Sequence, residues 1–187
     1  GCEAERLIGR GGMGEVWLAH REVDQQVAAL KLVRDASLTP ERRVRIRREA
    51  EALRSLEHPG IVRVYDAGDC GVGPWIAMEY VPGKSLAEIL ADREVDLRER
   101  ITIFRDIARA LATAHAAGIV HRDVTPQNVL VTDERRVVLI DFGLTRGIEP
   151  SPLSRTGSFV GTPHYAAPQP ARGASPAVRP PPAAPPL

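Results

Sequence analysis

The chain has 187 residues, of which 43% are hydrophobic and 26% are charged. This length suits one globular domain, with one or two lobes, and allows a sizeable buried core. The 25 basic and 24 acidic residues leave a formal net charge of +1. We therefore expect no nucleic-acid partner, because proteins that bind nucleic acid usually carry a marked basic excess.

Two cysteines, Cys2 and Cys70, lack the CxxC spacing of a zinc site and are too few for a disulfide scaffold. They favour a reducing, cytoplasmic location. No apolar run reaches the ~18 residues of a membrane helix, so we expect no membrane segment in this chain. The sequence leaves open a membrane anchor further downstream in a longer parent protein.

The first 82 residues read as five strands and one helix. The apolar alternation and the glycine or proline boundaries predict strands over residues 5–8, 15–20, 26–33, 61–65 and 75–80. Pro40 stands at a first-turn position and opens a helix predicted to reach Leu56. This segment, 1–82, is expected to be one lobe.

After Pro82 the periodicity becomes helical. Ser85 and Glu88 form a capping box for a short helix over 85–91. A long helix is predicted over 97–117, ended by Gly118. Its expected apolar stripe consists of Ile101, Phe104, Ile107, Ala108, Leu111 and Ala114. Short strands are predicted over 129–131 and 137–140.

The composition changes again near the end of the chain. Seven of the 16 prolines lie between residues 170 and 187, and no acidic residue follows Glu149. Such an Ala/Pro-rich tail has too little apolar content to pack, so polyproline II or disorder is expected over 170–187. The second lobe would then span only 83–169.

Glycines at positions 9, 11 and 14 form a GxGxxG pattern. Glycine lets backbone amides approach phosphate oxygens closely. Because a strand and not a helix follows the pattern, a flap over a nucleotide fits better than a dinucleotide-binding turn. An ordinary glycine hairpin is the structural alternative.

Lys31 ends the apolar strand at 26–33. Its ammonium could simply reach solvent, or it could supply a positive charge to the α- and β-phosphates of a nucleotide. In the second case it needs a carboxylate partner, and Glu49 on the arginine-rich helix is the natural candidate. Glu49 could equally pair with Arg45 on the same helix.

The most specific stretch is His121-Arg122-Asp123 followed by Asn128, with Asp141-Phe142-Gly143 thirteen residues further on. Asp123 could accept the proton of an attacking hydroxyl. Asn128 and Asp141 supply the oxygen ligands that Mg²⁺ prefers. An isolated Asp-Phe-Gly would indicate only a turn, but its order and spacing after the preceding motif make that interpretation improbable.

Together these motifs resemble the protein-kinase family, in the style of bacterial Ser/Thr kinases of the eukaryotic type. The resemblance runs from about Glu5 to Pro168. It implies an α+β, two-lobed protein-kinase-like fold, with a complete five-stranded N-lobe and a truncated helical C-lobe. It also implies an enzyme that uses ATP and Mg²⁺ to phosphorylate Ser or Thr hydroxyls of protein substrates.

The resemblance assigns roles residue by residue. Lys31 would contact the phosphates and pair with Glu49, Asp123 would be the catalytic base, and Asn128 and Asp141 would hold Mg²⁺. The adenosine and phosphates would be held by Ile8, Gly9, Gly11, Gly14, Val16, Ala29, Lys31, Met78, Glu79, Val81 and Leu130. Arg122 would bind a phosphate on the segment after Asp141, with Thr156 and Ser158 as the expected acceptors.

Two departures from the family pattern concern the catalytic lobe. Thr125 stands where Ser/Thr kinases usually carry a lysine, so one cation is missing and slower transfer is expected. Gln169 replaces the glutamate of the Ala-Pro-Glu motif, and the proline-rich residues after it cannot form the helix that should follow. A truncated or frame-shifted kinase and a stable short form both explain this ending; composition favours the first.

Three functional hypotheses follow. The leading one is a Ser/Thr protein kinase. The second is a catalytically weak or inactive nucleotide-binding scaffold, because an incomplete helical lobe could leave Asp123 and Asp141 out of register. An exposed apolar side of the helix at 97–117 would then favour self-association. A Rossmann-type dehydrogenase is excluded, since no helix follows the glycines.

Overall fold

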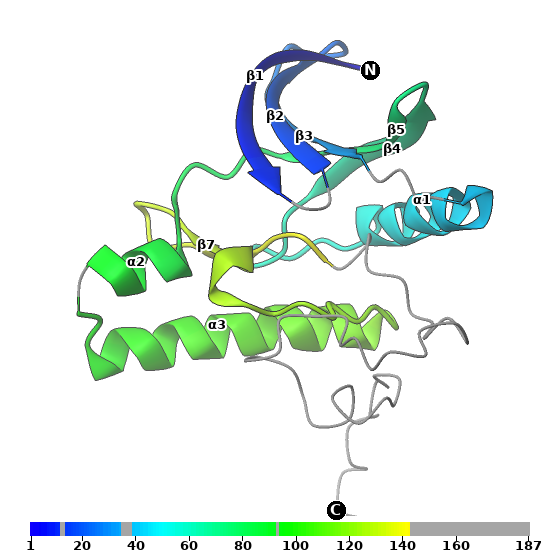
Figure 1. Ribbon diagram of the computed structural model, residues 1–187. Coiled ribbons are helices and arrows are strands. Elements are labelled where there is room, and N and C mark those ends of the chain that lie inside the picture. The colour runs from blue at the N-terminus through cyan, green and yellow to red at the C-terminus, as the bar shows by residue number, and fades with distance from the viewer. Residues whose placement is uncertain (12–13, 35–38, 93, 143–187) are drawn as a thin grey trace, which may run out of the picture.

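The fold is described from a computed structural model, which describes residues 1–11, 14–34, 39–92 and 94–142. Figure 1 shows a strand-rich lobe above and a helical lobe below. The expected tail at 170–187, the acceptors Thr156 and Ser158, and Gln169 all lie outside the described residues.

The upper lobe is an antiparallel sheet with the strand order β1-β2-β3-β5-β4. Its strands are β1 (Cys2–Gly11), β2 (Gly14–Arg21), β3 (Val27–Val33), β4 (Val64–Cys70) and β5 (Gly73–Glu79). The fourth strand begins three residues later than the 61–65 expected from its apolar run. Ile61 instead bridges Leu139 in the lower lobe, because its apolar side chain is needed in the core between the lobes.

Helix α1 (Pro40–Arg54) packs beside β4 and β5 (Figure 1). Thr39 caps it by accepting the Arg42 N–H, and Pro40 occupies the first turn as the sequence predicted. Ile46, Ala50 and Leu53 are its buried residues. The arginines of this helix therefore stay on its outer side, around an apolar stripe that faces the sheet.

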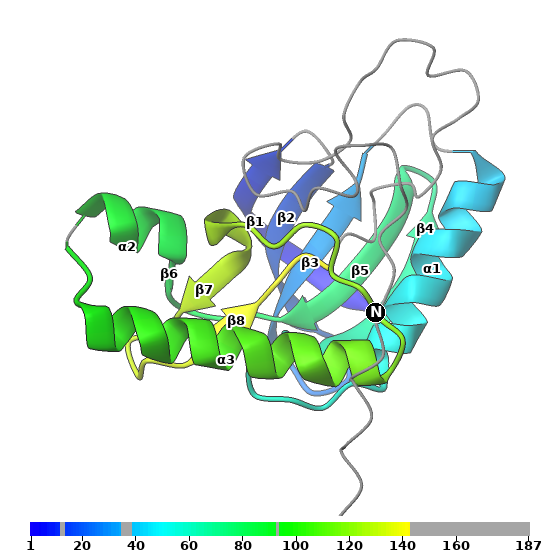
Figure 2. The same cartoon turned by 90° about the horizontal axis from the view of Figure 1, so that it is seen from below.

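The lower lobe holds α2 (Leu86–Asp92), α3 (Leu97–Ala116) and the small sheet β6-β7-β8. Its strands are β6 (Lys84–Ser85), β7 (Val129–Val131) and β8 (Val137–Leu139), and a 3-10 turn covers Pro126–Asn128. Glu88 and Ser85 form the expected capping box, with the Ser85 N–H donating to Glu88 at 2.7 Å. Seen from below, α3 lies across β7 and β8 (Figure 2).

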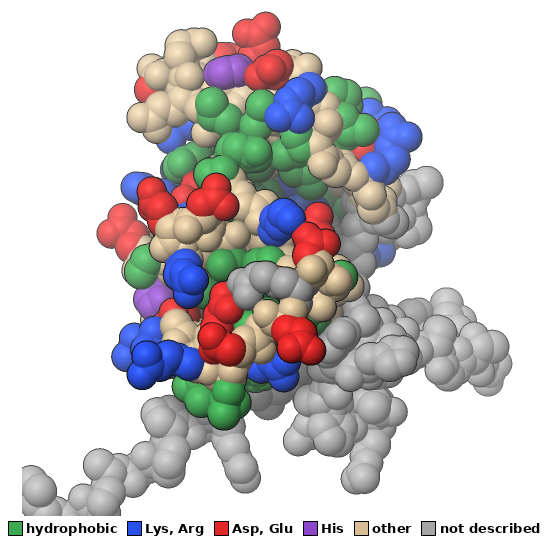
Figure 3. Space-filling view, turned by 90° about the vertical axis from the view of Figure 1, so that its left-hand side faces the viewer, with side chains coloured by type: hydrophobic (Ala, Val, Ile, Leu, Met, Phe, Trp, Pro, Cys, Tyr) green, Lys and Arg blue, Asp and Glu red, His purple; other side chains and the backbone are tan. Residues whose placement is uncertain are grey.

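The apolar residues of α3 divide between two faces of the helix. Ile103, Ala110 and Ala114 are buried, whereas Ile101 and Phe104 are 60% and 75% exposed. The single broad stripe expected from the sequence was therefore wrong. The helix has one apolar face toward β8 and a second one toward solvent, where hydrophobic side chains lie at the bottom of the lower lobe (Figure 3). A period of 3.6 residues cannot tell the two faces apart.

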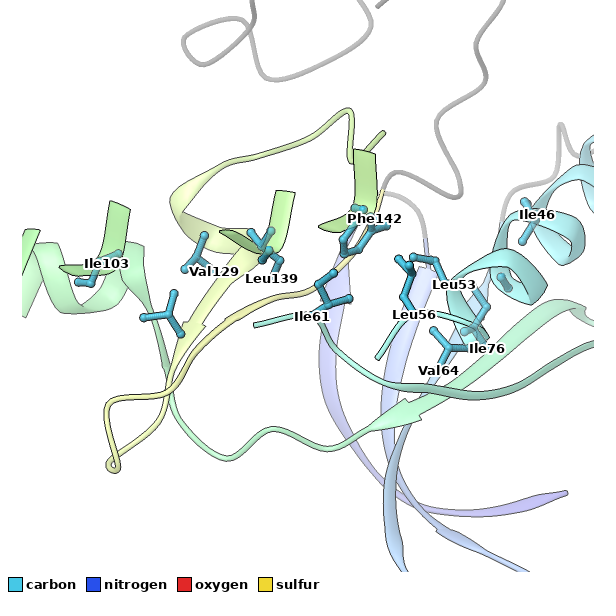
Figure 4. Packing of buried hydrophobic residues seen from close by; sticks show 14 of the residues in the cluster. Ile46, Leu53, Leu56, Ile61, Val64, Ile76, Ile103, Val129, Leu139 and Phe142 are labelled. Atoms are coloured by element: carbon cyan, nitrogen blue, oxygen red, sulfur yellow. The ribbon is translucent and has the colours of Figure 1, made fainter. Parts of the chain in front are cut away.

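One hydrophobic core joins the two lobes (Figure 4). Ile76 from the upper sheet and Leu139 from β8 are both 0% exposed within it. Two backbone hydrogen bonds tie the lobes at the same place: Leu139 N–H donates to Gly60, and Val62 N–H donates to Leu139. This link sets β8, and therefore Asp141 just beyond it, against the upper sheet.

Candidate active site

A largely apolar cavity of about 160 Å³ lies between the lobes. It is lined by Ile8, Val16, Ala29, Lys31, Val62, Met78, Glu79, Tyr80, Val81, Leu130, Ile140 and Asp141. Eight of the eleven residues expected to bind ATP are in this lining. The three that are not are the glycines of the β1–β2 flap.

Those three glycines differ in what the fold requires of them. Gly14 has φ +141°, and a Cβ there would collide with the Leu32 carbonyl on β3. At Gly9 a Cβ would meet Val16 at an ordinary 3.8 Å, and at Gly11 it would meet nothing within 4 Å among the described residues. Of the three flap positions, only position 14 therefore needs glycine for the described fold.

Lys31 lies at the inner end of the cleft, and its side chain is only 9% exposed. Its ammonium donates to Oδ1 of Asp141, whose side chain is 38% exposed. Strand β3 holds the lysine from above, and the link between β8 and the upper sheet presents the aspartate from below. Two residues 110 positions apart thus form an ion pair in the lining of the cleft.

Glu49, the expected partner of Lys31, is paired elsewhere. The Arg122 guanidinium donates to Glu49 Oε1 at 3.0 Å, with both side chains about a quarter exposed. The structure therefore does not form the Lys31–Glu49 pair expected from the resemblance. Arg122 has a left-handed φ of 65°, and its side chain reaches the Glu49 carboxylate on α1.

The loop before β7 holds Asp123 and Asn128 together. The Asn128 side-chain amide donates to both Oδ2 and the backbone carbonyl of Asp123, each at 2.9 Å. The Asn128 carbonyl in turn accepts the Ile140 N–H at 3.0 Å. This bond places Asn128 beside the residue that precedes Asp141, so the two motifs meet at one end of the β7–β8 pair.

His121 is the buried support of this arrangement, with 1% of its surface exposed. Its Nε2 bonds the Ile140 carbonyl at 2.9 Å, and its Nδ1 accepts the Asp123 N–H at 3.3 Å. Burial lowers the pKa of this histidine below its ordinary value of 6.5, against the opposing effect of the Ile140 carbonyl. A neutral ring protonated at Nε2 satisfies both bonds, and Phe142 packs against it at 4.4 Å.

Two oxygen atoms at this end of the sheet suit a hard cation such as Mg²⁺. Lys31 occupies one carboxylate oxygen of Asp141, and Asn128 uses its amide nitrogen toward Asp123. Within the described residues, this leaves the second oxygen of Asp141 and the amide oxygen of Asn128. Asn128 and Asp141 are therefore compatible with their expected role as the two ligands of Mg²⁺.

The sequence reasoning missed three residues of the cleft, namely Val62, Tyr80 and Ile140. Tyr80 and Ile140 are chain neighbours of residues that were named, so adjacency was a usable signal for them. Val62 gave no such signal, because its place in the cleft depends on its bond to β8. Thr125 is buried, with 5% of its surface exposed, and its hydroxyl carries no charge.

No helix within the described residues is long and apolar enough to cross a membrane. Both cysteines are free thiols.

Comparison with known proteins identifies the fold. The protein kinase domain family matches residues 2–176. A probable serine/threonine-protein kinase of Streptomyces coelicolor is 41% identical over 175 residues, which cover 89% of this chain and 26% of that protein. PknA of Mycobacterium tuberculosis, a serine/threonine-protein kinase, is 40% identical over 182 residues, covering 92% of this chain and 42% of PknA.

Solved structures agree with these relatives. A crystal structure of a variant of the M. tuberculosis PknI kinase domain superimposes with a TM-score of 0.76 at 34% identity, covering 95% of this chain and 67% of that one. A second PknI kinase-domain structure gives a TM-score of 0.71 at 37% identity, covering 77% and 60%. The chain spans less than half the length of the curated relatives described above. Its fold, its motifs and these matches show that the chain belongs to the protein kinase family and is related to bacterial serine/threonine-protein kinases.

Proposed function

We propose that this chain transfers the γ-phosphoryl group of ATP to serine or threonine hydroxyls of proteins. The observation that carries the proposal is that two pairs lie at the same end of the β7–β8 pair. Lys31 and Asp141 form one pair in the lining of the apolar cleft, and Asn128 and Asp123 form the other beside it. Phosphoryl transfer requires mainly positioning and charge neutralisation. These four side chains provide a cation, two metal ligands and a base.

The cleft itself suits a nucleotide. Val16 and Ala29 would cover the adenine from above and Leu130 would support it from below, since all three line the same apolar cavity. The backbone of the segment at 79–81 would bond the adenine edge. Because the Glu79 N–H donates to the Arg63 carbonyl at 2.8 Å, the Glu79 carbonyl would be the group that bonds the adenine.

Two of the flap glycines support phosphate binding, because packing does not require glycine at their positions. Gly9 and Gly11 have room for a side chain among the described residues, so packing does not explain glycine there. Close approach of the backbone to phosphate oxygens does explain it. Gly14 serves the fold and the flap together.

Asn128 and Asp141 would hold Mg²⁺, which neutralises phosphate charge when bound. Asp123 would accept the proton of the attacking hydroxyl. The Asn128 amide keeps the Asp123 carboxylate in one orientation, and neutral His121 fixes the loop from beneath. The free thiols Cys2 and Cys70 suit a reducing cytoplasm as the place of the reaction.

Thr156 and Ser158 remain the acceptors that we propose for autophosphorylation. Mass spectrometry after incubation with Mg-ATP should find phosphate on one of them. An unmodified segment over 144–160 in a chain that phosphorylates other proteins would contradict this assignment.

A nucleotide-binding scaffold is the second candidate, and one specific observation favours it. Glu49 is held by Arg122 and does not hold Lys31. A lysine without this carboxylate lacks the partner that the family uses to position it. The chain would then bind ATP without efficient transfer.

One paired experiment on the purified chain separates the two candidates. Mg-ATP binding is measured by calorimetry, and phosphate transfer to a serine- and threonine-rich protein is measured with labelled ATP. The Asp123→Asn variant, which keeps the shape of the side chain, is the matched control. Binding with transfer that disappears in the control supports the kinase. Binding without transfer selects the scaffold, and absence of both contradicts each.

A further inference from the structure

A second hollow lies on the opposite side of Ile61 and Val62 from the nucleotide cleft. Ile61 faces this hollow while its neighbour Val62 faces the cleft, and Glu79 borders both. We call it the rear groove. Its larger part has a volume of about 510 Å³ and is lined by Leu56, Glu57, His58, Pro59, Ile61, Arg63, Tyr65, Glu79 and Arg136.

The rear groove continues toward α3. An adjoining cavity of about 240 Å³ shares His58, Pro59 and Arg136 with the larger part. Its other lining residues are Gly60, Asp106, Arg109, Arg135 and Val137. The larger part lies within the size range of pockets that bind ligands, and the two parts adjoin at the three residues that they share.

Arginine dominates the charge of the rear groove. Four arginines, Arg63, Arg109, Arg135 and Arg136, line it together with three carboxylates, Glu57, Glu79 and Asp106. Only Arg136 is closely paired with one of these, Glu79.

The other three arginines have a distant carboxylate partner or none. Arg63 stands 3.9 Å from Glu57, and Arg109 stands 3.9 Å from Asp106. Asp106 is bound more closely, at 2.9 Å, by Arg105. No carboxylate in the described part of the chain pairs with Arg135. Exposed ion pairs at such distances contribute little to stability, so an incoming carboxylate can replace these partners.

The β7–β8 turn fixes the backbone from which Arg135 and Arg136 extend. The β7–β8 turn is closed by the Arg135 N–H bond to the Thr132 carbonyl at 2.8 Å and by the Arg136 N–H bond to the Thr132 hydroxyl at 3.1 Å. Arg135 adopts a left-handed φ of 63° in that turn. A turn that is already closed loses less backbone entropy when a partner binds.

His58 adds a directed donor to the floor of the rear groove. The Gly60 N–H donates to His58 Nδ1 at 3.0 Å, so the proton of the neutral ring is on Nε2. Arg136 Nε is buried and has no acceptor among the described residues. Two nitrogen donors in the rear groove, His58 Nε2 and Arg136 Nε, therefore have no acceptor among the described residues, while Leu56 and Ile61 provide an apolar floor.

We propose that the rear groove docks an acidic, extended segment of a protein substrate, outside the site of phosphoryl transfer. Arginine guanidinium groups match carboxylates in fork geometry, and the apolar floor would take an intervening aliphatic side chain. Nucleic acid is disfavoured because Glu57, Glu79 and Asp106 interrupt the positive charge. Calling the partner a substrate rests on the proposed function; the docking of the segment does not.

The test measures binding in the absence of ATP, so that a catalytically inactive chain still gives an answer. The probe is a labelled twelve-residue peptide of Asp, Glu and Leu, and its counterpart carries Asn and Gln instead. We expect fluorescence anisotropy to show at least ~10-fold tighter binding of the acidic peptide, as charged hydrogen bonds suggest. Arg135→Glu should weaken that binding ~10-fold or more.

Arg98→Glu is the matched control, because Arg98 is an exposed arginine of α3 that does not line the rear groove. It changes the net charge by the same amount and should leave binding within about twofold if the effect is local. Equal binding of the acidic and amide peptides would overturn the proposal. Equal weakening by both variants, or tighter binding of an oligonucleotide of the same length, would also overturn it.

A kinetic measurement then asks whether docking serves catalysis. For a substrate with an acidic segment, Arg135→Glu should raise KM about as much as it weakens peptide binding, with KM for ATP unchanged. A short acceptor peptide without that segment should show no difference. An equal rise in KM for both substrates would overturn the link to the substrate, whereas absence of all transfer would count against the proposed function and not against docking.

Discussion

The Lys31–Asp141 pair predicts that its two partners respond unequally to mutation. The lysine side chain is 9% exposed, whereas the aspartate side chain is 38% exposed. Removing the lysine charge leaves a carboxylate that water can reach. Removing the aspartate charge leaves an ammonium group enclosed between the lobes. The same ion pair is lost in both cases, but the charged group that remains is exposed to water in the first and buried in the second.

We expect Lys31→Met to change the free energy of unfolding by no more than about 1 kcal/mol, because the remaining carboxylate is solvated and the methionine fills the stem of the lysine. Asp141→Asn keeps the side-chain shape and tolerates the left-handed φ of 58°. It should nevertheless cost roughly 1–3 kcal/mol, because a buried charge loses its counter-charge. In melting temperature, each kcal/mol corresponds to about 2–4 °C for a chain of this size.

Urea unfolding of the two variants and of the double variant tests this expectation. Lys31→Met should rescue the stability of Asp141→Asn, since no buried charge then remains, so the two effects should not add. Phosphate transfer should fall by on the order of 100-fold in either single variant, because each loses a charged group at the phosphates. Equal destabilisation by the two single variants, or simple additivity in the double variant, would refute the reasoning.

Three further predictions concern the flap, the core and the buried histidine. Gly14→Ala should lower the unfolding free energy by more than about 1 kcal/mol because its Cβ collides with β3. Gly11→Ala should keep the stability and weaken ATP binding. Equal melting temperatures of these two variants would contradict the expectation for Gly14. Ile76→Ala should cost about 2–5 kcal/mol in chemical denaturation, and Val72→Ala, at a residue 62% exposed, less than about 0.5 kcal/mol. Folding lowers the pKa of His121, so the unfolded chain takes up a proton as the pH falls through 6.5 while the folded chain does not. The free energy of unfolding should therefore decrease as the pH is lowered from about 7.5 to about 5.5. His121→Asn should reduce that slope in urea midpoints, and an unchanged slope would count against the assignment.

Much of this site could be predicted from sequence, because the relevant signals are local. The glycine pattern between two strands, Asp123 followed by Asn128, and Asp141 after an apolar strand each lie within a few residues of one another. Turn chemistry and strand ends act over that same range. Eight of the residues that the resemblance to protein kinases assigned to the ATP site line the cleft.

Only the tertiary structure decided which charges meet. Glu49 had Lys31 and Arg45 as candidate partners in the sequence, and the fold brings Arg122 to it from 73 positions away. The energy of an ion pair depends on separation and burial, and both are set by how α1 and the loop before β7 pack on a shared core.

The same limit explains the division of α3 and the rear groove. Helical periodicity marked the apolar residues of α3, but a neighbouring surface selects which of them become buried. The rear groove collects side chains from the segment after α1, from β5, from α3 and from the β7–β8 turn. The sequence by itself determined the chemistry available to this kinase fold. Long-range packing decided which of those groups became partners, because distance and desolvation are properties of the folded chain.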